Sequence, residues 1–280
     1  MKRLFALFVA AICTMSMWAH DFEVDGIYYN ILTHRNHEVE VTYRGSFSLD
    51  FEDEYSGSVT IPETVTYNGT TYKVTWIGAA AFSRCSGLTD VTIPNRVMFI
   101  EAYAFDGCSS LMSVEIPNSV WSIGNDAFFN CKSLTSITIP ESVIDIGYNT
   151  FSRCTSLTSI TFYSPQLIIG TNAFYQCTSL TSITCFTLTP PQLHDNTFSE
   201  LPIEGIVVFV PEVAVEEYKS TPIWQDLYII GQDFVISDLE NIGLDNGYGV
   251  MGNRKFLRHG QIVIIRDGVE YNALGQTIKE

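Results

Sequence analysis

A repeat of 23 residues is the feature that most restricts how this chain can fold. Four apolar columns recur at this interval through the middle of the sequence, and three valines keep the same step. The columns are Phe82, Phe105, Phe128, Phe151 and Phe174; Cys85, Cys108, Cys131, Cys154 and Cys177; Leu88, Leu111, Leu134, Leu157 and Leu180; Ile77, Ile100, Ile123, Ile146 and Ile169; and Val97, Val120 and Val143. One such short unit cannot bury its apolar side chains until neighbouring units cover it, so the repeat predicts a stack of coils.

Each repeat unit divides into a strand and a return segment. Residues 134–139 read Leu-Thr-Ser-Ile-Thr-Ile and predict a short strand whose apolar residues face inward. Pro140 ends it because proline lacks a backbone donor. Residues 125–130 are predicted to be a turn or a short helical segment on the far side. Parallel strands lie about 4.8 Å apart, so five regular coils predict one parallel sheet with the phenylalanines in a single buried column. We therefore predict an α/β solenoid of 23-residue coils over residues 77–200.

The segments around the repeats predict an exported chain with capped ends. Lys2 and Arg3 precede an apolar run, and Ala19 supplies the small residue of a cleavage site, so residues 1–19 are predicted to be a signal peptide. Residues 20–76 alternate in polarity and contain the turn pair Asn68-Gly69, which predicts an N-terminal β cap with a hairpin. Residues 201–233 are predicted to form a C-terminal cap, and residues 234–280 a linker followed by a β-hairpin tail.

The repeat unit also resembles a known family. The pattern I-P-x-x-V-x-x-I-G-x-x-A-F-x-x-C-x-x-L, which runs here from Ile116 to Leu134, is similar to the BspA-like leucine-rich repeat of bacterial surface proteins. The resemblance extends over roughly residues 60 to 200. Residues 21–31 resemble the lead-in segment of such proteins in Bacteroidota, and the tail is similar to their C-terminal sorting segments, with a stabilising terminal hairpin as the alternative. The resemblance implies an extracellular, non-catalytic protein that adheres to host or microbial proteins.

Charge and motif content exclude several functional classes. The chain has 15 Lys and Arg against 31 Asp and Glu, a net charge of -16, which disfavours binding to nucleic acid or anionic lipid. No apolar run outside the N-terminus is long enough to span a membrane. The glycines between Gly247 and Gly252 lack the strand and helix that a dinucleotide site needs, and His34 and His37 lack further ligands. We expect no catalytic residue, no metal and no cofactor, and the chain is not predicted to be an enzyme.

The cysteine column predicts free thiols despite the exported context. Parallel side chains one strand apart hold their Cβ atoms about 4.8 Å apart, beyond the usual 3.5 to 4.5 Å of a disulfide. Small buried thiols that cap backbone groups of the turns are the simpler interpretation.

Two surfaces are candidates for ligand binding. The outward positions of the strands form a ladder of small hydroxyl residues, from which Glu115, Thr138 and Thr161 are candidate ligand-binding residues. Alternatively, these residues merely suit an exposed pleated surface, or a regular ladder orders water.

The second surface is a column of nominally outward, mostly apolar residues on the flank of the coils. It consists of Thr75, Met98, Trp121, Ile144 and Leu167, from which we select Met98, Trp121 and Ile144 as partner-binding candidates. The alternative is that this column packs against a neighbouring loop or cap.

The functional prediction is a secreted or surface-displayed binding or adhesion protein. Its partner is predicted to be an extracellular protein or glycan, with the identity and the oligomeric state left open. The alternative is a structural spacer or assembly scaffold that displays another element at the cell surface.

Overall fold

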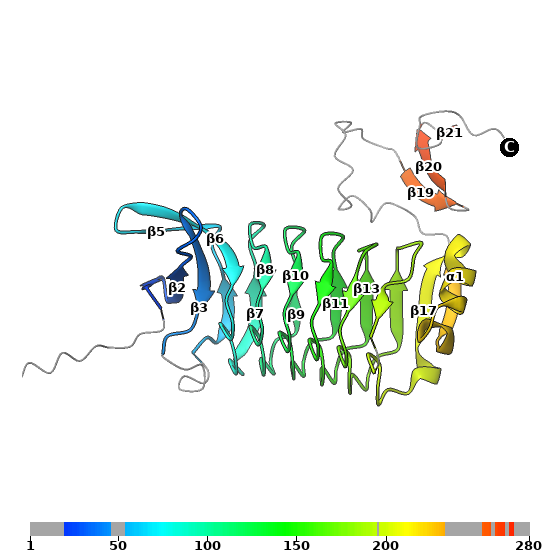
Figure 1. Ribbon diagram of the computed structural model, residues 1–280, viewed down its shortest axis with the longest axis horizontal. Coiled ribbons are helices and arrows are strands. Elements are labelled where there is room, and N and C mark those ends of the chain that lie inside the picture. The colour runs from blue at the N-terminus through cyan, green and yellow to red at the C-terminus, as the bar shows by residue number, and fades with distance from the viewer. Residues whose placement is uncertain are drawn as a thin grey trace, which may run out of the picture.

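The computed structural model describes residues 20–45, 54–194 and 196–232, and the backbone of three further strands between 254 and 271. The predicted signal peptide and the predicted linker lie outside the described residues. Figure 1 shows the repeats as a row of similar coils stacked along one axis. The predicted solenoid is therefore confirmed, while the boundaries of the caps and tail stay predictions.

One side of the coils carries a ladder of very short strands, which we call the flank sheet. It has ten strands in all and continues into the N-terminal segment. These are β1 (Phe22–Val24), β2 (Ile27–Ile31), β3 (Glu38–Thr42), β5 (Thr64–Tyr67), β6 (Thr70–Ile77), β8 (Phe99–Ile100), β10 (Ser122–Ile123), β12 (Asp145–Ile146), β14 (Ile168–Ile169) and β16 (Gln192–Leu193). From β6 to β16 the strands pair in parallel at matching repeat positions. This ladder was not predicted from the sequence, because a two-residue strand carries no alternation.

The opposite ladder contains the strands that the sequence predicted, and its outward side is the strand face. Its first part is β4 (Gly57–Thr60), β7 (Leu88–Thr92) and β9 (Ser113–Val114). Its second part is β11 (Ser136–Ile139), β13 (Ser159–Phe162), β15 (Ser182–Cys185), β17 (Val207–Pro211) and β18 (Tyr228–Gln232). The expectation of one continuous sheet is wrong, because β9 and β11 belong to separate sheets.

The segments between the ladders are turns in the described coils. Each regular coil places residues in the left-handed backbone region, such as Asp126 at φ 55° and Asn130 at φ 61°. The turns bond along the stack, since the Phe128 amide donates to the Thr150 carbonyl at 2.8 Å. Of the two alternatives, turn and short helix, the structure has the turn.

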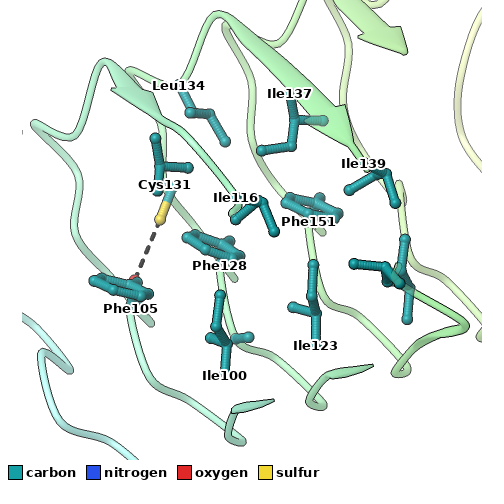
Figure 2. Packing of buried hydrophobic residues seen from close by; sticks show 14 of the residues in the cluster. Ile100, Phe105, Ile116, Ile123, Phe128, Cys131, Leu134, Ile137, Ile139 and Phe151 are labelled. Atoms are coloured by element: carbon teal, nitrogen blue, oxygen red, sulfur yellow. Dashed lines mark hydrogen bonds between the residues drawn. The ribbon is translucent and has the colours of Figure 1, made fainter. Parts of the chain in front are cut away.

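The phenylalanine column is the centre of the core. Phe82, Phe105, Phe128, Phe151 and Phe174 are all fully buried. Their ring centroids are 5.0, 5.0, 5.3 and 5.5 Å apart in order, with interplanar angles of 7° or less. These distances suit offset aromatic stacking, and Figure 2 shows Phe105, Phe128 and Phe151 in line. The predicted contiguous column is confirmed, and Phe198 extends it by a further 5.7 Å.

The cysteine column packs beside the phenylalanines as free, buried thiols. From Cys108 to Cys177, each thiol of the column donates to a phenylalanine carbonyl of the preceding coil, for example from Cys131 Sγ to Phe105 O at 3.2 Å (Figure 2). Burial raises the pKa of Cys131 and of Cys154, so both thiols keep the proton that they donate. The prediction of free thiols that cap backbone groups is confirmed.

Both ends of the stack carry additional elements. At the N-terminal end, β5 and β6 form an antiparallel hairpin around Asn68 and Gly69, both with positive φ, as the sequence predicted. At the other end lie η1 (Ile203–Gly205), η2 (Glu212–Ala214), α1 (Val215–Ser220) and η3 (Trp224–Asp226). Trp224 is fully buried here and its Nε1 donates to the Pro191 carbonyl at 2.9 Å. In the described part of the chain, α1 is the only α-helix, and no helix has the length and apolar character needed to cross a membrane.

The C-terminal strands form a small sheet of their own. They are β19 (Arg254–Arg258), β20 (Gln261–Arg266) and β21 (Val269–Tyr271), and they pair in antiparallel order. The predicted linker and hairpin tail, and a sorting role for this segment, stay predictions.

Candidate functional site

The flank of the coils exposes large apolar side chains at two of the three selected positions. Trp121 is 57% exposed and Ile144 is 50% exposed, while Met98 is half-buried beside them. Backbone bonds hold the three residues in one row, because the Trp121 amide donates to the Met98 carbonyl and the Ile144 amide to the Trp121 carbonyl. A row of large apolar side chains in water is typical of a surface that meets another molecule.

Two members of the proposed outward column point inward. Leu167 is 1% exposed and Thr75 is 5% exposed, so the expectation that they face solvent is wrong. In earlier coils a proline stands three residues before the buried valine, as Pro140 does before Val143. In this coil, by contrast, the equivalent position is Tyr163 and the proline comes two residues later. The shifted loop lets Leu167 take the buried place of the valine column, and Ile168 is the exposed apolar residue there instead.

Two further aromatic residues extend the row toward the N-terminal segment. The rings of Trp76 and Phe99 lie 4.4 Å apart by centroid, and Phe99 meets Trp121 edge-on at 6.5 Å. We call Trp76, Met98, Phe99, Trp121 and Ile144 the aromatic stripe. Trp76 and Phe99 were not among the residues predicted from the sequence. The signal was their own 23-residue spacing, one position after the column that was selected.

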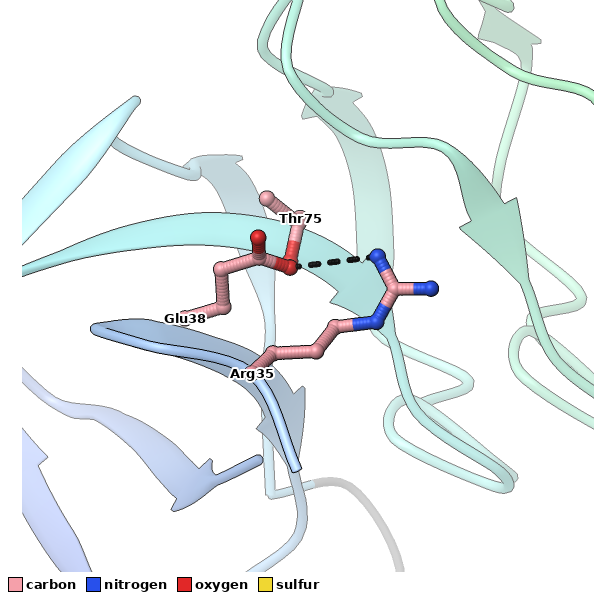
Figure 3. Close-up of polar contacts among 3 residues, drawn as sticks. All are labelled: Arg35, Glu38 and Thr75. Carbon is pink, nitrogen blue, oxygen red and sulfur yellow. Dashed lines mark hydrogen bonds and ion pairs between the residues drawn. The ribbon is translucent and has the colours of Figure 1, made fainter. Parts of the chain in front are cut away.

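A cation closes the N-terminal end of the aromatic stripe. The Arg35 guanidinium lies 5.5 Å from the centre of the Trp76 ring, a cation–π distance. Glu38 orients the guanidinium, since its carboxylate forms an ion pair with Arg35 at 3.4 Å. The same carboxylate accepts a hydrogen bond from the Thr75 hydroxyl at 3.0 Å. Figure 3 shows the three residues together, with Glu38 on β3, Thr75 on β6 and Arg35 in the turn before β3. The buried Thr75 hydroxyl thus has a structural partner and takes no part in the exposed surface.

The strand face contains a groove of about 460 Å³ that brings two other candidates together. Glu115 and Thr138, both exposed, line it with Ser113, Ser136 and Tyr163. The third candidate of this face does not reach it: Thr161 pairs with Thr138 and Thr184 along the ladder but lies outside the lining. The hydroxyl residues therefore do lie in register along the strands, whereas the groove involves only β9 and β11 of this face.

The ladder changes character at its C-terminal end. Ser182 and Thr184 register with Val207 and Phe209 on β17, and these register with Tyr228 and Ile230 on β18. Tyr228 is 62% exposed. The polar surface thus ends at the last regular coil.

The acidic groups with altered proton affinity are scattered over the coils. Burial raises the pKa of Asp106, Asp126 and Glu101 above the usual carboxyl values, in the last case with help from the nearby Glu40. Asp126 is 6% exposed and interacts with Tyr103 and Asn149, a structural arrangement within the turns. Among the described residues, no group of three or more His, Cys, Asp or Glu side chains is arranged to hold a metal ion.

Comparison with known proteins agrees with the repeat geometry. Residues 74–205 match the BspA type leucine-rich repeat region in six copies. No curated protein matches the sequence. A solved leucine-rich repeat protein of T. pallidum is 28% identical, with 58% of this chain and 70% of that chain covered and a TM-score of 0.49. A leucine-rich repeat protein of Bacteroides capillosus ATCC 29799 is 31% identical over 51% of this chain and 97% of that chain, with a TM-score of 0.42.

A leucine-rich cell surface protein of Faecalibacterium prausnitzii A2-165 is 20% identical. It covers 91% of this chain and 59% of its own length, with a TM-score of 0.51. This likeness concerns the fold alone. Taken with the 23-residue columns and the stacked coils that they produce, the six matched copies lead to one conclusion: the chain belongs to the BspA-type leucine-rich repeat family.

Proposed function

We propose that this chain is an exported, non-catalytic binding protein that adheres to a protein partner at the cell surface. The exposed Trp121 in the centre of the aromatic stripe carries the proposal. Tryptophan is enriched among the residues that supply most of the energy of protein interfaces. Exposing an apolar row of this kind to water is unfavourable, and a partner surface that covers it gains the free energy of burial.

The composition of the aromatic stripe supports a protein as the partner. Trp76, Phe99 and Trp121 supply rigid apolar area, and the half-buried Met98 adapts to irregular surfaces. Arg35 at one end offers a planar donor group already oriented by Glu38. Interface cores are enriched in aromatic residues, methionine and arginine, and this is the combination found here.

Two observations support a location outside the cell. The N-terminal residues have the basic start, apolar run and small terminal residue of a signal peptide. The F. prausnitzii protein that shares the fold is described as a cell surface protein. The buried thiols need no disulfide, so the coils hold together through apolar packing in any redox environment.

The test is a binding screen of the full chain against immobilised extracellular-matrix and bacterial surface proteins by biolayer interferometry. Trp121→Ala is expected to weaken binding of the partner by about 30-fold, the effect of losing a central aromatic anchor of about 2 kcal/mol.

Tyr148→Ala is the matched control, because Tyr148 is a 46% exposed aromatic residue on the turn side of the coils. Equal loss in both variants, or no loss in Trp121→Ala with unchanged circular dichroism, contradicts the proposal. Absence of binding to every protein supports the spacer alternative.

A further inference from the structure

The groove on the strand face lies at the one place where the two sheets of that face meet without pairing. Ser113 belongs to β9, the last strand of the first sheet, and Ser136 and Thr138 belong to β11, the first strand of the second. All three line the groove, which draws its lining from four successive coils. The groove therefore coincides with the break between the two described sheets of the strand face.

The lining is made of groups that both donate and accept hydrogen bonds. Ser113, Ser136 and Thr138 contribute hydroxyls, Asn95 and Asn118 contribute amides, and Glu115 and Glu141 contribute carboxylates. Hydroxyl and amide groups act in both directions and carboxylates accept only, with stronger, charge-assisted bonds. Such a set matches a ligand that presents many hydroxyl groups at close spacing.

One wall of the groove is aromatic. Tyr163 occupies the repeat position of Pro117 and Pro140, and all three line the groove. The Tyr163 ring stacks on Phe186 of the next coil at 4.5 Å and 10°, so it is held in a fixed orientation. A fixed aromatic wall opposite polar side chains accepts a ligand with an apolar C–H face and a polar edge, as a pyranose ring has.

Charge restricts the class of ligand further. In the described part of the chain, neither Glu115 nor Glu141 has an ion-pair partner, and no Lys or Arg is among the residues that line the groove. The net charge of the whole chain is also strongly negative, at -16. Sulfated or carboxylated sugars are repelled by this potential.

We propose that the strand-face groove, formed at the break between β9 and β11, is a binding site for a short, neutral oligosaccharide. Thr138 and Glu115 bind its hydroxyl groups, and Tyr163 packs against the apolar face of one sugar ring. The volume of about 460 Å³ lies within the range of small-ligand sites and suits a short oligosaccharide. This site lies on a different face from the aromatic stripe, so it does not depend on the proposed protein adhesion.

The experiment is isothermal titration calorimetry of the full chain with neutral tetrasaccharides of glucose, mannose, xylose and N-acetylglucosamine. A heparin tetrasaccharide and a lysine-rich peptide form the two contrasting arms. We expect at least one neutral tetrasaccharide to bind and heparin not to bind. Thr138→Val, which removes one hydroxyl at constant size, is expected to weaken binding about tenfold, and Tyr163→Ala by more than that.

Thr184→Val is the matched control, because Thr184 occupies the same ladder position two coils away, outside the groove. It is expected to bind the sugar as the unchanged chain does. The proposal is overturned if no neutral sugar binds, or if the chain binds heparin or the peptide in preference to the neutral sugars. Equal loss of sugar binding in Thr138→Val and Thr184→Val also overturns it. Because Thr138 is exposed, Thr138→Val is expected to fold normally. It therefore tests the site even if Tyr163→Ala disturbs the packing of its coil.

Discussion

Truncation of Phe128 to alanine tests whether the stacked aromatic column holds the coils together. Phe128 is fully buried, and its ring lies between Phe105 at 5.0 Å and Phe151 at 5.3 Å. The lost transfer free energy of the ring is about 2 kcal/mol. A cavity of about 100 Å³ adds roughly 2.4 kcal/mol, because neighbouring coils restrict collapse. We therefore expect the free energy of unfolding to fall by about 4 kcal/mol.

Urea denaturation followed by circular dichroism measures this change. With a slope of about 3 kcal/mol per molar urea, the midpoint is expected to shift by roughly 1.3 M. Phe129→Ala is the control, since Phe129 is the adjacent aromatic residue but is only partly buried, with Arg153 over its ring at 5.5 Å. A loss below about 1 kcal/mol in Phe128→Ala, or equal losses in both variants, would refute the role of the column.

Three further outcomes follow from the packing of the coils. Gly147→Ala places a Cβ 2.6 Å from the Asn125 backbone nitrogen and is expected to destabilise by about 2 kcal/mol, whereas Gly205→Ala meets open space and should leave the melting temperature nearly unchanged. The Cys154 thiol, fully buried and with a raised pKa, is expected to react with Ellman's reagent only after unfolding in urea; prompt labelling of the native chain would argue against it. Because burial raises the pKa of Asp126 above the ordinary 3.8, the native state binds that proton more tightly, so stability falls as pH rises through the window between the ordinary and the raised pKa. Thermal melts across pH 4 to 7 check this, and Asp126→Asn should flatten the dependence.

The central coils were predictable because one period fixes the contacts along the axis. Residues 23 apart must lie one strand spacing apart in a stack, so Phe105, Phe128 and Phe151 had to form a column once the chain coiled. The same reasoning kept the cysteines apart as thiols and marked Trp121 as a candidate for an exposed anchor. The hairpin at Asn68-Gly69 was predicted separately, from a turn dipeptide whose residues suit the left-handed backbone.

The candidate sites depend on contacts that the period does not specify. The tilted ring contact of Trp76 with Phe99 and the edge contact of Phe99 with Trp121 join two neighbouring columns, and their approach depends on how each flank strand orients its side chains. The displaced proline before Leu167 turned an expected surface residue into a core residue.

The sequence by itself therefore determined the solenoid and its core columns, since repetition sets the translation from each coil to the next. The tertiary structure alone decided that β9 and β11 do not pair and that Glu115, Thr138 and Tyr163 line one groove. The physical reason is that a groove and an aromatic stripe come from departures from the repeat and from contacts across it. These departures and contacts depend on the path of individual loops and on side-chain packing, which a periodic pattern does not determine.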